Sequence, residues 1–84
     1  MLNTRGHHPS VSHFAHLFDH DHLPPHLAAV SRLFHDLAQR LLDVLSDGPE
    51  LVAGLRKLVE AKDCAVRQLL VDEQAREDNA HQLL

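Results

Sequence analysis

The four residues SDGP, positions 46–49, separate two long stretches in which apolar residues recur at helical spacing. Glycine suits the left-handed conformation in which many helices end, and proline fits the first turn of a helix. We therefore expect one helix to end near residue 45 and another to begin at Pro49, with Asp47 or Gly48 as its cap. A turn this short makes two helices antiparallel neighbours.

The stretch before this turn predicts an amphipathic helix of about 20 residues, which opens at Leu23-Pro24-Pro25 because proline is tolerated in a first helical turn. Its apolar residues recur mostly at steps of three and four, opposite a charged side. They are Leu27, Val30, Leu33, Phe34, Leu37, Leu41, Val44 and Leu45. Counted with Ala38 and Leu42, this apolar arc spans roughly 180°, which is wider than a single stripe.

The stretch after the turn predicts a helix from Pro49 to about Ala75, with fraying to Leu84. It contains RKLVEAKDCAVRQLL, residues 56–70, in which Lys62 falls in the middle of the apolar side. Ammonium groups are rarely buried without a partner. Lys62 has three alternatives: its stem lies along apolar surface with the charge at the edge, it pairs with an acid of another helix, or it faces an anion in a cavity between protomers.

The apolar arcs of both long helices exceed what two helices and a short third one can bury. Leftover apolar surface of this kind marks an interface, and closed symmetric assemblies are the common form. The sequence therefore predicts an all-α fold, a short N-terminal helix plus a long antiparallel helical hairpin, that assembles as a homo-oligomer. The alternative is a monomeric three-helix domain with an apolar surface.

The histidine-rich N-terminal segment, residues 1–23, is expected to precede a hairpin domain of residues 24–84. It holds six of the nine histidines, namely His7, His8, His13, His16, His20 and His22. Residues 1–9 lie outside every apolar stripe, so we expect an exposed tail that contributes little to stability.

A short helix is expected from about residue 12 to residue 20, with Phe14, Leu17 and Phe18 on one face. On such a helix three histidines also share a face: His13, His16 and His20. Three stacked imidazoles can bind zinc, nickel or copper if a fourth ligand arrives. The alternative is a histidine-rich tail without a metal site.

Composition excludes several classes of protein. The 84 residues suit one domain, and 12 acids against 8 bases give a formal charge of −4, which argues against binding duplex nucleic acid through phosphates. No apolar run is long enough to span a membrane, and the lone Cys64 cannot form an internal disulfide, so we expect a soluble protein in a reducing cytoplasm. No catalytic or cofactor motif is present, and a pair of Cys64 with His35 or His81 is poorly supported, so we expect no enzyme.

Four of the eight basic residues lie within twelve positions: Arg56, Lys57, Lys62 and Arg67. They point in several directions, so a single chain cannot aim all of them at one ligand, whereas a symmetric oligomer can gather copies around an axis. Arginine contacts phosphate in bidentate fashion and lysine as a point charge. The alternative is a solvated helix face, on which Asp63 and Arg67 pair at a spacing of four.

The segment LRKLVEAKDCAVR, residues 55–67, resembles the second helix of the hairpin shared by phage anti-CBASS and anti-Thoeris proteins. The similarity comprises the basic pair Arg56-Lys57, then EAKD at 60–63 and AVR at 65–67. The preceding helix is similar in length and pattern only, so the resemblance covers about half of the chain.

This resemblance implies a sponge that binds cyclic di- or trinucleotide immune signals without cleaving them. Similar proteins form hexamers of helical hairpins, which implies a homohexamer in the cytoplasm of the infected bacterial host. The match carries over four candidate ligand contacts: Arg56, Lys57, Lys62 and Arg67. Related proteins stack an aromatic side chain on a base, and Phe14 and Phe18 are the candidates here.

Two other functions remain open from the sequence. A helical hairpin can bind another protein's helix through its apolar face, which explains the stripes but leaves the cationic cluster as ordinary solvated charge. A metal-binding regulator would use the histidines of the N-terminal segment. No metal site and no cofactor belong to the preferred hypothesis.

Overall fold

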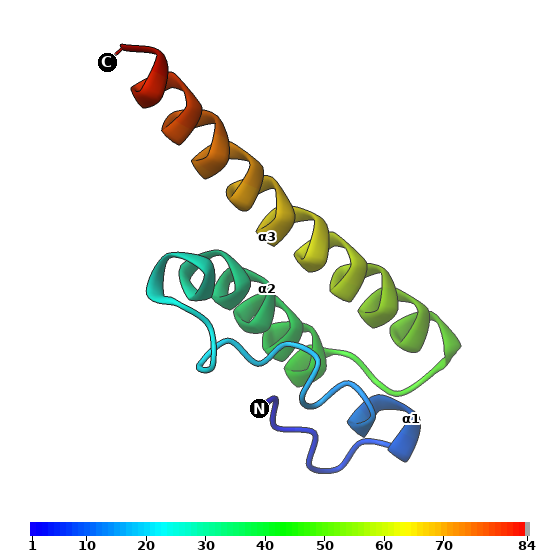
Figure 1. Ribbon diagram of the computed structural model, residues 1–84. Coiled ribbons are helices and arrows are strands. Elements are labelled where there is room, and N and C mark those ends of the chain that lie inside the picture. The colour runs from blue at the N-terminus through cyan, green and yellow to red at the C-terminus, as the bar shows by residue number, and fades with distance from the viewer. Residues whose placement is uncertain (84) are drawn as a thin grey trace.

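The computed structural model describes the backbone of residues 1–83 and the side chains of residues 1–80. Three helices follow one another along the chain (Figure 1): α1 is Pro9–Ser12, α2 is Pro25–Val44 and α3 is Pro49–Leu83. These residues contain no strand, so the predicted all-α fold is confirmed for the described part. The side chain of His81 and all of Leu84 lie outside it. No helix within residues 1–83 combines the length and hydrophobicity that a membrane span requires.

The helices α2 and α3 pack side by side, and α3 continues well beyond the start of α2 (Figure 1). The helix α2 has 20 residues, as its apolar spacing predicted. It ends where Leu45 becomes extended (φ −109°), and the carbonyl of Gly48 accepts the first hydrogen bond of α3 from Val52 N at 3.2 Å. Gly48 is therefore the cap of α3, but the left-handed conformation expected at the turn is absent from it. Among the described glycines only Gly6 has a positive φ, of 83°.

The N-terminal segment does not form the predicted helix over residues 12–20. The helix α1 is a single turn, at which the His8 side chain accepts a hydrogen bond from Ser10 N, and turns follow it through residue 18. Two carbonyls that a longer helix would use internally are bonded elsewhere. The carbonyl of Ala15 accepts from Leu2 N at 2.9 Å, and that of Leu17 accepts from Lys62 Nζ at 2.6 Å. Tertiary hydrogen bonds have replaced helical ones.

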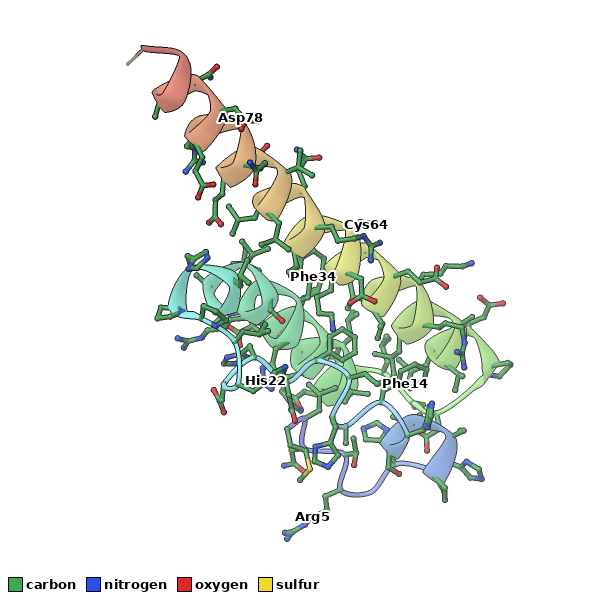
Figure 2. The ribbon with its side chains drawn as sticks, in the orientation of Figure 1. Arg5, Phe14, His22, Phe34, Cys64 and Asp78 are labelled. Atoms are coloured by element: carbon green, nitrogen blue, oxygen red, sulfur yellow. The ribbon has the colours of Figure 1, made fainter. Side chains whose placement is uncertain are left out.

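One core joins the N-terminal segment to both long helices (Figure 2). Its buried residues are Leu2, Val11, Phe14 and Phe18 from the segment, and Ala38, Leu42, Leu51 and Leu55 from α2 and α3. Half of these residues therefore come from residues 1–23. The histidine-rich segment and the following helices pack as one unit.

The expectation of an exposed tail over residues 1–9 is wrong. Leu2 is only 1% exposed, and the backbone of Asn3 is held on both sides by Gln39 of α2. Burying a leucine side chain stabilises a fold by about 1.5–3 kcal/mol. Leu2 was overlooked because it stands alone among polar residues and belongs to no periodic stripe.

Candidate functional site

Lys62 faces the N-terminal segment. Its Nζ donates to the carbonyl of Leu17 at 2.6 Å, lies 3.2 Å from the Asp63 carboxylate and stands 6.0 Å from the centroid of the Phe18 ring. The side chain is 15% exposed, so the stem is covered while the ammonium reaches the edge. The acid that it contacts belongs to its own helix, not to another. Lys62 thus ties α3 to residues 13–18.

Replacing Lys62 by methionine should therefore lower the free energy of unfolding by about 1 kcal/mol, since the apolar stem is kept and the hydrogen bond to Leu17 is lost. The matched control is Lys57→Met, because Lys57 is exposed and makes no hydrogen bond to the described side chains. Urea unfolding followed by circular dichroism measures both. Equal stability of the two variants would show that the Leu17 contact contributes nothing.

Arg56 and Lys57 line a groove beside the turn between α2 and α3, which we call the turn groove. Its volume is about 780 Å³, and its lining residues are His8, Ser10, Asp47, Gly48, Pro49, Val52, Ala53, Arg56, Lys57 and Glu60. The Arg56 guanidinium lies 5.5 Å from the centroid of the Phe14 ring, a cation–π contact that positions the charged end of this side chain. Within residues 1–80, neither cation has a carboxylate partner within 4 Å. Both remain available to an anion.

The start of α3 adds to the positive potential of the turn groove. Gly48 and Pro49 lie on its wall, so the first turn of a 35-residue helix borders it. A helix start carries a partial positive charge that favours anions. Pro49 has no N–H to donate, and the Glu50 carboxylate in the first turn offsets part of this charge, so the dipole adds less to the turn groove than the two side chains do.

Two carboxylates, those of Asp47 and Glu60, also line the turn groove, and the negative charge of Asp47 is already compensated by hydrogen-bond donors. Asp47 accepts hydrogen bonds from His7 Nδ1 and from the backbone N–H of His8, both at 2.6 Å. These bonds hold the pKa of Asp47 below its usual value, chiefly through the His7 side chain. Glu60 is then the remaining uncompensated acid against Arg56 and Lys57.

His7 fastens the N-terminal segment to the end of α2. Its Nδ1 faces the Asp47 carboxylate at 2.6 Å, and its Nε2 faces the carbonyl of Leu42 at 3.0 Å. A carboxylate and a carbonyl can only accept, so both contacts are hydrogen bonds only when the ring carries two protons. The hydrogen bond to Asp47 accordingly raises the pKa of His7 above its ordinary value of 6.5.

The contacts of His7 with Asp47 and with the Leu42 carbonyl, which we call the His7 latch, should make the free energy of unfolding depend on pH. The contribution of His7 to the free energy of unfolding is fully present below about pH 6.5, and it is lost as the pH rises through the raised folded-state pKa of His7. That of Asp47 is present above about pH 3.8 and is lost as the pH falls through its lowered folded-state pKa. The stability difference between wild type and His7→Ala should therefore be larger at about pH 5.5 than at about pH 8.5 in urea melts. The exposed His22 supplies a control variant, His22→Ala, and an equal difference at both pH values would contradict the latch.

Arg67 lies away from the turn groove, at a smaller cleft of about 400 Å³. The lining residues of this cleft are His16, Leu17, Asp19, His22, Leu23, Ser31, Lys62, Asp63, Val66 and Arg67. The predicted pair of Asp63 with Arg67 is not formed, because the Asp63 carboxylate contacts Lys62 and the Arg67 guanidinium contacts Cys64 Sγ at 3.4 Å. Cys64 itself is exposed. The four candidate cations therefore divide between two places.

Phe14 and Phe18 belong to the core. They are 1% and 0% exposed, so neither ring offers a face on which a base could stack in this arrangement. The helix face that Phe14, Leu17 and Phe18 were expected to share is not formed: Leu17 is 40% exposed, while Phe14 and Phe18 are buried against α2 and α3. The two rings instead support Arg56 and Lys62 from beneath.

The histidines of the N-terminal segment do not converge. Without the predicted helix, His13 packs edge-on against Phe14, His16 contacts Asp19 at 3.0 Å and His20 packs against His35. In the part of the chain that the structure describes, no three histidine, cysteine or acidic side chains gather in a metal-binding arrangement. The metal-binding alternative depended on one helix face shared by His13, His16 and His20, and the structure does not contain that face.

The sequence did not identify three residues of the turn groove: His8, Ser10 and Asp47. They come from the segment taken for a tail and from a turn residue considered only as a helix cap. The pairing of His7 with Asp47 spans forty positions, and no local sequence pattern indicates it.

Comparison with known proteins gave no match to a family model, to a curated protein or to a solved structure.

Proposed function

We propose that this chain is a sponge that binds cyclic di- or trinucleotides and holds them without cleaving them. The observation that carries the proposal is the turn groove, where Arg56 and Lys57 stand free of acidic partners beside the start of α3. Phosphates of the ligand would meet these two cations. Bases would lie against Val52 and Ala53, the apolar part of the wall.

The dimensions of the turn groove suit this class of ligand. Small-molecule sites usually measure about 300–1,000 Å³, and the turn groove measures about 780 Å³. Its charge suits the ligand as well, because a cyclic dinucleotide carries two phosphates. Charged hydrogen bonds to phosphate contribute about 1.5–3 kcal/mol each. The resemblance of residues 55–67 to anti-CBASS and anti-Thoeris proteins points to the same ligands.

The working form in this proposal is a homo-oligomer of helical hairpins, a hexamer by analogy with those proteins. A groove open on one side in a single chain would be closed by a neighbouring protomer, and this would remove the ligand from water. The site of action would be the cytoplasm of an infected bacterium, where such signals are made.

Calorimetric titration of the wild-type protein with a panel of cyclic di- and trinucleotides tests the proposal. We expect at least one member to bind at nanomolar affinity, about −12 kcal/mol, and to be recovered unchanged after release. A linear dinucleotide of the same bases is the control for simple charge attraction. If no member of the panel binds at micromolar concentration, the sponge hypothesis fails for these ligands.

The second candidate is a module that binds a helix of another protein. It is favoured by large apolar side chains that remain exposed on α2, with Leu33 at 68% and Val44 at 75%. This candidate would leave Arg56 and Lys57 without a role. Its mark would be stoichiometric binding of a second protein in the absence of any nucleotide.

A further inference from the structure

The charged side chains that line the turn groove balance one another. Among its lining residues, all within residues 1–80, are the cations Arg56 and Lys57 and the carboxylates Asp47 and Glu60. Opposite charges in one groove reduce the potential that an approaching anion experiences. The ring of His7 lies outside the lining, but its Nδ1 is 2.6 Å from the Asp47 carboxylate. A proton on this ring therefore decides whether the turn groove as a whole is positive or neutral.

Both ring nitrogens of His7 face hydrogen-bond acceptors. Nδ1 faces the Asp47 carboxylate and Nε2 faces the carbonyl of Leu42 at 3.0 Å, in a side chain that is 14% exposed. A ring with a single proton satisfies only one of these acceptors and turns a lone pair toward the other. The titratable groups that face the His7 latch or share the turn groove are Asp43 from α2, Asp47 from the turn, His8 from the N-terminal segment, and Arg56, Lys57 and Glu60 from α3.

The His7 latch also attaches one wall of the turn groove. The two carboxylate oxygens of Asp47 contact consecutive residues: Oδ1 contacts the His7 ring, and Oδ2 accepts from the backbone N–H of His8 at 2.6 Å. His8 and Ser10 line the groove, and their side chains contact each other at 2.9 Å. Loss of one His7 contact therefore loosens the attachment of this wall, while the bond to the His8 backbone remains.

We propose that the His7 latch is a pH-sensitive switch of the turn groove: the groove attracts anions while the ring carries two protons and loses this attraction when the ring carries one. Two effects act in the same direction. Without the second proton the Asp47 carboxylate is no longer compensated, so it opposes an anion held by Arg56 and Lys57. The wall that follows the latch is also held less firmly. His7 is a positioning residue, because it does not line the groove and acts through Asp47.

The inference rests on the turn groove of the proposed function and names a regulator of that groove. Coupling between two binding events is reciprocal, so an anion that binds better to the protonated form makes His7 easier to protonate. The switch can therefore be measured from the ring, with sulfate as the anion and no nucleotide present. It can also be measured from the nucleotide, whose affinity should depend on pH.

The first measurement follows the histidine ring protons of the full chain by NMR between about pH 5 and about pH 9, in sodium sulfate and in sodium chloride of equal ionic strength. Sulfate keeps its charge over this range. The resonance of His7, assigned by its loss in His7→Gln, should titrate about half a pH unit higher in sulfate than in chloride. The difference should vanish in Arg56→Ala/Lys57→Ala.

The second measurement titrates the protein with the cyclic nucleotide that wild type binds most tightly, at about pH 5.5 and about pH 8.5. Phosphodiesters are charged at both values. The affinity of wild type should be at least about fivefold weaker at the higher pH, and that of His7→Gln should change less than about twofold. The matched control is His8→Gln, which removes the imidazole that lines the groove and should keep the pH dependence.

An unchanged titration midpoint of His7 in sulfate overturns the inference. Equal nucleotide affinity of wild type at the two pH values also overturns it and leaves the sponge intact. A pH dependence that persists in His7→Gln but disappears in His8→Gln assigns the effect to the charge of His8 and overturns the inference as well. A shift of His7 in sulfate without binding of any cyclic nucleotide upholds the switch and refutes the sponge.

Discussion

Replacement of Leu2 by alanine is expected to lower the free energy of unfolding by about 2–5 kcal/mol, a large share of the stability of so small a domain. The Leu2 side chain is 1% exposed and packs in the cluster with Val11, Phe14 and Phe18. Truncation removes transfer free energy and leaves a cavity. The neighbouring segment can fill that cavity only partly, because the Leu2 backbone is bonded to Ala15.

Met1→Ala is the matched control for this variant. Met1 is also large and apolar, but it is 70% exposed, so its truncation should change stability by less than about 0.5 kcal/mol. The chain has no tryptophan or tyrosine, so unfolding is followed by circular dichroism at 222 nm in urea, at one fixed protein concentration. A change for Leu2→Ala as small as that for Met1→Ala would restore the view of residues 1–9 as a loose tail.

The two long helices could be predicted from the sequence because their signals are local. Apolar spacing set the extent of α2 to within two residues, and Pro49 marked the start of α3. The C-terminal limit was less accurate, since α3 continues to Leu83 and not only to about Ala75. Beyond Val71 the apolar stripe fades, so periodicity no longer reports on a helix that projects past its neighbour (Figure 1).

The N-terminal segment could not be predicted in the same way, because its structure depends on distant partners. The carbonyl of Leu17 is bonded by Lys62, forty-five positions away, and His7 is held by Asp47. Contacts between residues so far apart produce no periodic pattern in the sequence. The same limit applies to the candidate site, where Arg56 and Lys57 were recognised by type but Asp47 and His8 were brought to them by folding.

The position of Lys62 shows how a residue at odds with its helix stripe can be explained by the fold. Its ammonium interrupts the apolar side of α3 because it donates a hydrogen bond to a backbone carbonyl of the N-terminal segment. This bond lies at an exposed edge, so the charge stays near water while the stem of the side chain is covered. For this reason we assign ligand phosphates to Arg56 and Lys57, whose donors are not used in this way.

The double variant Arg56→Ala/Lys57→Ala should weaken the binding of a cyclic nucleotide by about a hundredfold or more. Each cation is expected to supply about 1.5–3 kcal/mol to a phosphate contact, and every 1.4 kcal/mol is a factor of ten in affinity. The fold should be little affected, because both side chains are exposed and, within residues 1–80, the interaction that is lost is the cation–π contact of Arg56 with the Phe14 ring, about 0.5–1 kcal/mol.

The control removes the same number of charges at another place on the surface. Arg32→Ala/Arg40→Ala alters two exposed arginines of α2 that do not line the turn groove. Titration of both double variants with the nucleotide that binds wild type most tightly compares them directly. If the control loses as much affinity as Arg56→Ala/Lys57→Ala, attraction by overall charge explains the binding. If neither loses affinity, the turn groove is not the site. A loss confined to Arg56 and Lys57 places the phosphates beside the start of α3, where helix dipole and side chains act together.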